Sequence, residues 1–204
     1  MGMLSRVKTP ELISETLQTL LTLVTPPPPA APAVDGAATE TEAPAPVVIH
    51  ADDNAQFILE TGCQETSAWK GGAPIVAVWS AAVSPEIKLQ AVRLFSHLFA
   101  FASSRAKQDS AFLACVRAFQ IEGSPCTSLL ACLDVSERED LELSSLRAIS
   151  LLLDDPPDTS FLSTFYEAQG LNRVLRVATK TERHFHEPML QVVETFSRYG
   201  AFLL

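Results

Sequence analysis

The chain has 204 residues, of which 47% are hydrophobic and 19% are charged, enough for one domain with a substantial core. The formal net charge is −9 at pH 7, which argues against nonspecific binding of DNA or RNA as the main role. No apolar run reaches the length of a membrane span, and no secretory signal is visible. We therefore expect neither a nucleic-acid partner nor a membrane span.

The four cysteines, Cys63, Cys115, Cys126 and Cys132, show no CxxC spacing. Three of them fall on the apolar faces of predicted helices. We therefore interpret the cysteines as reduced core residues rather than as disulfides or metal ligands. Reduced thiols favour a cytoplasmic location for the protein.

The N-terminal segment, residues 1–24, is predicted to form an amphipathic helix. Thr9, Pro10 and Glu11 are typical of a helix start: a capping residue, a proline at the first helical position and an acid in the first turn. The apolar residues that follow at helical spacing are Leu12, Ile13, Leu17, Leu20, Leu21 and Val24. This helix must pack on the rest of the chain, because so short a helix is marginal alone.

Residues 25–48 are predicted to be a disordered linker rich in proline and alanine. Seven of the 14 prolines lie between Pro26 and Pro46, and the proline run after Thr25 is typical of polyproline II. No PxxP motif is flanked by a basic residue. A spacer is therefore favoured over a ligand for a proline-binding domain.

Residues 49–204 are predicted to form one helical domain. Phe57, Ile58 and Trp69 suggest a weak helix near its start. The run from Ile75 to Trp79 has strand propensity, but it is short and has no candidate partner strand nearby. We therefore favour a short helix for this run.

From residue 84 onward, apolar residues recur at helical spacing between short breaks. Helices are expected to begin at Ser84, at residue 105 (ending at residue 121), at Pro125 and at the capping box Ser136–Glu139. Another is expected after residues 155–158, with Gly170 as its C′ residue, followed by helices over residues 171–179 and from His186 to Gly200. The residues expected to face the core are Ile87, Ala91, Leu94, Phe95, Leu98, Phe99, Phe112, Cys115, Val116, Phe119, Leu129, Leu130, Leu133, Leu146, Ile149, Leu152, Leu153, Phe161, Leu162, Phe165, Leu190, Val193, Phe196 and Tyr199.

This pattern predicts an all-α fold. Helices of this length joined by short loops are typical of an armadillo- or HEAT-like α-solenoid, a right-handed superhelix of stacked helices. The repeats are not obvious as copies in the sequence, so a compact irregular helical bundle is the alternative.

The order of these segments resembles the calcium-binding protein 39 family, an armadillo-like scaffold for kinases. The resemblance rests on Lys8–Ile13, Ala73–Val76, Ala91–Phe95, Leu146-Arg147 and Glu194–Phe196. It covers most of the chain, as a short or C-terminally truncated member of the family. It implies a non-catalytic adaptor whose partner is a protein kinase or pseudokinase.

The chain departs from that family in two respects. The segment Phe101–Ser104 stands where the family has a basic stretch. The C-terminal repeats that hold the family's pocket for a pseudokinase peptide have no counterpart here, so no residue of that pocket can be transferred.

The sequence offers no catalytic, cofactor-binding or metal-binding constellation. Nucleotide-binding and hydrolase motifs are missing, and so is an EF-hand. His97 is interpreted as a partly buried structural residue. His184 and His186 have no third ligand at a suitable spacing. The acid pairs Asp52-Asp53 and Asp154-Asp155 are interpreted as caps and turn formers. We expect a protein that is not an enzyme and needs no cofactor.

A basic stripe is the first candidate binding feature. Arg173, Arg176, Lys180 and Arg183 are spaced 3, 4 and 3 residues apart, so one continuous helix would place them on one face. Such a face could bind an acidic or phosphorylated partner segment. The alternative is an ordinary solvated helix face.

The apolar C-terminal segment is the second candidate. Phe202, Leu203 and Leu204 follow directly on the last predicted helix. They either fill the last groove of the domain or form an exposed end that invites a partner or self-association.

Two functions follow as hypotheses. The first is a cytoplasmic, non-catalytic helical-repeat adaptor that presents a groove to a protein partner, with a kinase or pseudokinase implied by the family resemblance. The alternative is a structural subunit of a cytoskeletal or other large assembly, held through the apolar C-terminal end and the N-terminal helix.

Overall fold

The computed structural model describes residues 9–26, 50–62, 72–82, 84–121, 125–134, 138–154, 159–179 and 186–200. Within these ranges the chain is all-α, and no strand is present. The helices are α1 (Pro10–Val24), α2 (Ala51–Gly62), α3 (Ala73–Ala81), α4 (Pro85–Ala106), α5 (Ala111–Ile121), α6 (Pro125–Leu133), α7 (Glu139–Asp154), α8 (Thr159–Glu167), α9 (Gly170–Ala178) and α10 (His186–Gly200).

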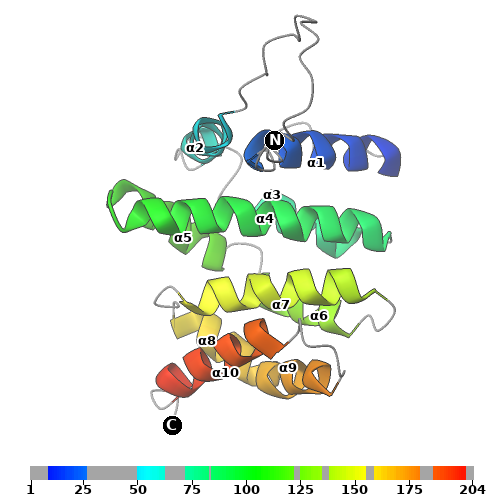
Figure 1. The fold of residues 1–204 in the computed structure, drawn as a ribbon, viewed down its shortest axis with the longest axis vertical. Helices are drawn as coiled ribbons and strands as arrows, with labels where there is room; N and C mark the ends of the chain where they lie inside the picture. The colour runs from blue at the N-terminus through cyan, green and yellow to red at the C-terminus, as the bar shows by residue number, and fades with distance from the viewer. Residues whose placement is uncertain are drawn as a thin grey trace, which may run out of the picture.

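Four helices far apart in the sequence lie side by side (Figure 1). Helices α1, α4, α7 and α10 pack in that order and run in the same direction, and we call this layer the helix stack. Behind the stack, α3 packs on α4, α6 packs on α7, and α8 and α9 lie against α6. Two layers of helices thus enclose the core between them.

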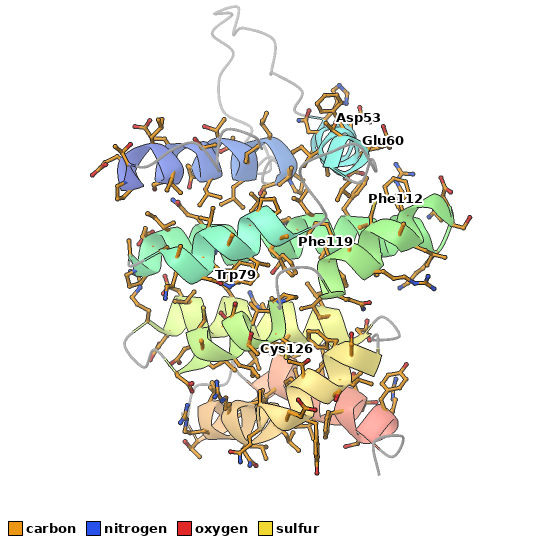
Figure 2. The ribbon with its side chains drawn as sticks, turned by 180° about the vertical axis from the view of Figure 1, so that it is seen from behind. Asp53, Glu60, Trp79, Phe112, Phe119 and Cys126 are labelled. Atoms are coloured by element: carbon orange, nitrogen blue, oxygen red, sulfur yellow. The ribbon has the colours of Figure 1, made fainter. Side chains whose placement is uncertain are left out.

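The centre of the core is an aromatic cluster formed by Trp79, Phe95, Phe99 and Phe119, all almost fully buried. The Phe95 ring lies 5.2 Å from the ring of Trp79 and 5.2 Å from that of Phe119, measured between centroids. Trp79 and Phe119 come from α3 and α5, behind the stack (Figure 2). These edge-to-face and tilted contacts fix α3 and α5 against α4.

The N-terminal helix and the helix near Ile75 are confirmed. α1 begins at Pro10 after Thr9, whose extended backbone suits an N-cap, although its hydroxyl makes no capping hydrogen bond. α3 is a nine-residue helix with Pro74 in its first turn, and Ile75, Val76 and Trp79 are buried. Burial against α4 explains why a run of strand-forming residues is helical here.

The predicted start of a helix at residue 105 is wrong. α4 continues to Ala106, and α5 begins only at Ala111. Ala102 is fully buried, and the Phe101 ring packs on Phe112 of α5 at 6.4 Å. The guanidinium of Arg105 also lies 5.4 Å from the centre of the Phe101 ring. These contacts extend α4 beyond the predicted boundary.

Gly170 is not a C′ residue. It is the first residue of α9, and its neighbour Gln169 takes the left-handed conformation instead, with φ 54°. A Cβ atom at Gly170 would lie 2.5 Å from the ring of Phe165. The glycine is therefore required by the close approach of this aromatic ring rather than by its backbone angles.

On α10, Phe196 and Tyr199 pack against the core as predicted, but the inward face in the first half of the helix is rotated from the predicted one. Leu190 is 60% exposed, whereas Val192 and Thr195 are buried. The hydroxyl of Ser150 on α7 donates a hydrogen bond of 2.8 Å to Oε1 of Gln191. This contact turns the Gln191 side of α10 toward α7, which carries Leu190 away from the core.

The described cysteines differ in whether they are free or disulfide-bonded. Cys126 and Cys132 are free and buried, as predicted, and burial raises the pKa of the Cys126 thiol to about 12. Cys115, however, is disulfide-bonded, which corrects the prediction of a reduced residue at this position. The argument for a cytoplasmic location from reduced thiols is weaker for that reason.

Several predictions fall on residues outside the described ranges: Trp69, the hydroxyl of Ser136 in the capping box, and the linker beyond Pro26. Among the helices that the structure describes, none is both long and apolar enough to cross a membrane.

Candidate functional site

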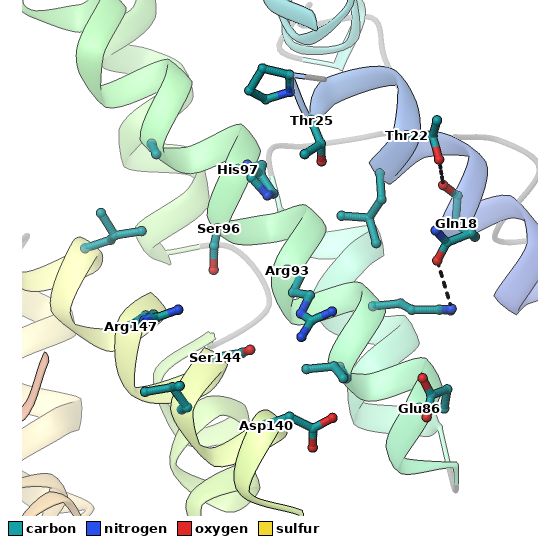
Figure 3. A pocket seen from close by; sticks show the side chains of 17 residues that line it. Gln18, Thr22, Thr25, Glu86, Arg93, Ser96, His97, Asp140, Ser144 and Arg147 are labelled. Carbon is teal, nitrogen blue, oxygen red and sulfur yellow. Dashed lines mark hydrogen bonds between the residues drawn. The ribbon is translucent and has the colours of Figure 1, made fainter. Parts of the chain in front are cut away.

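A groove of about 920 Å³ runs across α1, α4 and α7 on the outer face of the helix stack (Figure 3). We call it the α1–α4–α7 groove. Its lining residues are Gln18, Leu21, Thr22, Thr25 and Pro26 from the end of α1; Glu86, Leu89, Gln90, Arg93, Ser96, His97 and Ala100 from α4; and Asp140, Leu143, Ser144, Arg147 and Leu151 from α7. Leucines from all three helices form an apolar part, while most other lining side chains are polar.

Three polar residues of the groove share one position, counted from the start of their helix. Gln18, Arg93 and Arg147 each lie eight residues after the first residue of their helix. The three helices run in the same direction and lie side by side, so these side chains reach the groove from neighbouring helices. The sequence thus builds a row of polar side chains that crosses the helices.

An ion cluster closes the end of the groove where α4 and α7 begin. Arg138 contacts Glu86 of α4 at 3.1 Å and Asp140 of α7 at 2.8 Å, measured between Nη2 and a carboxylate oxygen. Hydrogen bonds from Arg138 hold the pKa of Asp140 below its usual value, and the two carboxylates raise the pKa of Arg138. Both groove carboxylates therefore already have a cationic partner.

Arg93 and Arg147 differ from Arg138. Both are exposed, and neither makes an ion pair or side-chain hydrogen bond with any residue in the part of the chain that the structure describes. The charge of Arg93 contributes only a minor lowering of the Asp140 pKa, behind the contacts from Arg138. Both side chains reach toward the space between α4 and α7 (Figure 3). The groove consequently carries two guanidinium groups without an ion-pair partner among the described residues.

His97 lines the same groove, one helical turn after Arg93. It is not a buried core residue, since its outer edge is exposed, but the surrounding groove walls remove part of its hydration. This desolvation, followed by the charge of Arg93, lowers the pKa of His97. The imidazole is therefore predominantly neutral at pH 7 and adds a hydrogen-bonding group.

Two glutamine amides connect α1 to α4 at the groove. Nε2 of Gln90 donates to Oε1 of Gln18 at 3.3 Å, and Oγ of Ser14 donates to Oε1 of Gln90 at 3.0 Å. The hydroxyl of Thr22 donates to the backbone carbonyl of Gln18 at 2.9 Å (Figure 3). This network places amide groups at the α1 edge of the groove.

The predicted basic stripe does not rest on one helix. α9 ends at Ala178, and Lys180 and Arg183 lie outside the described residues. Arg173 and Arg176 both pair with Asp134 at the end of α6, the first with 3.1 Å between Nη1 and Oδ2. These two arginines therefore anchor α9 to α6, which favours the structural interpretation for them.

The other sequence candidates can be placed as follows. His184 and the C-terminal residues Phe202, Leu203 and Leu204 lie outside the described residues. His186 is exposed at the start of α10. Among the described residues, no group of three or more metal-binding side chains gathers.

The acid pair Asp52-Asp53 lies at a helix boundary, as predicted. Asp52 and Asp53 lie in the first turn of α2, and Asp53 Oδ2 lies 3.6 Å from Nδ1 of His50. Acids in this position interact favourably with the helix dipole.

Sequence reasoning missed the α1–α4–α7 groove. No single predicted helix indicates the groove, because it exists only where positions of three helices combine. A signal was nevertheless present: aligning the helices on their first residues places Gln18, Arg93 and Arg147 in one column.

Comparison of the chain with protein-family models, with curated proteins and with solved structures finds no match.

Proposed function

We propose that this chain is an armadillo-like α-solenoid that acts as a non-catalytic scaffold and binds a protein partner in the α1–α4–α7 groove. The observation that carries the proposal is the groove itself, an open surface assembled from apolar and polar side chains of three parallel helices. Stacked helices characteristically present extended binding surfaces of this kind.

The open shape of the groove favours a protein partner over a small molecule. Small-molecule pockets enclose most of the surface of their ligand. This groove is open to solvent, and Gln18, Arg93 and Arg147 line it from three different helices. Such a surface suits a chain that lies across several helices.

The groove lacks an arrangement that supports catalysis. Ser96 and His97 are adjacent on α4, so their side chains point in different directions, and the Ser96 hydroxyl donates to the carbonyl of Val92 at 2.8 Å. No nucleophile thus lies beside a base among the groove residues, which supports a binding role.

For the partner we propose a protein kinase or pseudokinase, in the cytoplasm. This part of the proposal rests on the motif resemblance to the calcium-binding protein 39 family, including Leu146-Arg147, whose arginine lines the groove.

The test is affinity purification of the tagged chain from its native cells, with mass spectrometry of the bound proteins. The groove variant carries Arg93→Glu and Arg147→Glu. The matched control carries Lys107→Glu and Arg117→Glu, the same charge change at exposed sites outside the groove.

The proposal expects a stoichiometric partner on the wild type and the control that is lost from the groove variant. A kinase as that partner supports the kinase assignment. A partner that stays on all three proteins would rule the groove out as its binding site.

The second candidate function is a structural subunit of a larger assembly. It is favoured by exposed apolar side chains in the last three helices, Tyr166 of α8, Leu175 of α9 and Leu190 of α10. Serine substitutions at Leu175 and Leu190 should release the chain from a large complex, measured by size-exclusion chromatography of cell extract. An unchanged elution volume would argue against this candidate.

A further inference from the structure

The charge balance of the α1–α4–α7 groove identifies the chemistry of its ligand. Glu86 and Asp140 share one cation, Arg138, which compensates one of their two negative charges. Arg93 and Arg147 form no ion pair with any residue that the structure describes. Arg93, Arg138 and Arg147 against Glu86 and Asp140 leave one net positive charge at the groove, in a chain whose formal net charge is −9.

The spacing of the two helices that carry the arginines follows from helix packing. Arg93 and Arg147 occupy equal positions on neighbouring helices that run in the same direction. Packed helices have axes about 8–10 Å apart. A peptide in the extended polyproline II conformation advances about 3.1 Å per residue with three residues per turn, so side chains at i and i+3 share one face and lie about 9 Å apart.

We propose that the groove selects an extended acidic segment of the partner protein, with carboxylate side chains at positions i and i+3 that pair with Arg93 and Arg147. The inference rests on the scaffold function proposed above and adds the chemical class of its ligand. Each guanidinium belongs to a different helix and can bind one carboxylate through two parallel hydrogen bonds.

The α1 edge of the groove supplies contacts for the peptide backbone. The amides of Gln18 and Gln90 lie beside the arginine row and can donate to and accept from an extended main chain. Leu89 and Leu143 provide apolar surface between the polar positions. Specificity for acidic residues then comes from the arginines, and sequence-independent affinity comes from the amides and leucines.

The experiment is selection of a displayed library of short random peptides on the full-length chain, followed by affinity measurement of the enriched peptides by fluorescence anisotropy. The test variant is Arg93→Gln with Arg147→Gln, which removes charge and keeps helix propensity. The control variant is Lys107→Gln with Arg117→Gln. Circular dichroism confirms that both variants keep the wild-type helix content.

The expected result is enrichment of Asp or Glu at i and i+3 on the wild type and the control. Loss of two exposed ion pairs weakens binding roughly tenfold in the test variant. Peptides with their acids replaced by Gln should bind the wild type as weakly as the acidic peptides bind the test variant. High salt should remove most of the difference between the proteins.

Two results would overturn the inference. Enrichment of neutral or basic peptides that compete for the groove would leave the scaffold function intact and refute the acidic specificity. If no peptide of any charge is enriched over the control matrix, both the acidic specificity and peptide binding in the groove are refuted.

Discussion

At the scale of single residues, the structure separates side chains that look alike in the sequence. Arg138, Arg173 and Arg176 each have carboxylate partners, whereas Arg93 and Arg147 have none among the described residues. An exposed arginine with a partner mainly fixes local geometry, while an exposed arginine without one is available to a ligand.

Gly170 provides a residue-scale test of packing. Gly170→Ala should destabilise the fold by about 1–3 kcal/mol, because the new Cβ would lie 2.5 Å from the Phe165 ring. Urea denaturation measures the change. The substitution should cost less in a Phe165→Leu background, since the smaller side chain leaves room for the methyl group. An equal cost in both backgrounds would show that the ring is not the cause.

His97 provides a test of electrostatics. Desolvation and Arg93 lower its pKa in the folded state, so the unfolded chain binds the proton more readily. Above the unfolded pKa of about 6.5 both states are neutral, and His97 makes no difference to stability. As the pH falls below that value, protonation favours unfolding, and the wild type loses stability until the folded pKa is passed.

His97→Gln should therefore lose less stability than the wild type between about pH 7 and pH 5. Urea denaturation of both proteins across this range gives the comparison. The same loss in both proteins would show that the pKa of His97 is not lowered by folding.

At the scale of helices, the sequence predicted which helices exist and which residues they bury. It predicted less well how each helix is rotated about its axis and where it ends. Proline and acid signals placed the starts of α1 and α4 correctly, since these depend on local chemistry. The exposure of Leu190 and the extension of α4 to Ala106 could not be predicted, because they follow from contacts with α7 and α5. The groove escaped prediction for the same reason: it depends on the register between helices.

Asp134 tests the anchoring of α9. It pairs with Arg173 and Arg176, so Asp134→Asn should remove both contacts at once. Exposed ion pairs contribute about 0.2–1 kcal/mol each, so we expect a loss of roughly 0.5–2 kcal/mol in the free energy of unfolding. Arg173→Gln with Arg176→Gln should cause a similar loss, and combining all three changes should add little.

Full additivity of the Asp134 and arginine substitutions would contradict this account. It would mean that the arginines contribute through contacts other than Asp134.

At the scale of the whole molecule, the architecture assigns different tasks to its two faces. The inner face of the helix stack meets α3, α5 and α6 around the aromatic cluster and provides stability. The outer face of α1, α4 and α7 carries the groove and is free of that packing requirement. All-α character was predictable from periodicity, whereas the division between a core face and a binding face required the arrangement of the helices in space.

The most direct test of the central claim is site-specific photocrosslinking in native cells. A photoreactive phenylalanine analogue is placed at Thr22 or Ser144, which line the groove on α1 and α7, or at the exposed Arg117 outside it. The account predicts one common protein crosslinked from both groove positions and not from Arg117, with the crosslink lost when Arg93 and Arg147 are changed to Glu. No crosslink from either groove position, beside a partner captured from Arg117, would contradict the claim that the α1–α4–α7 groove is the binding site.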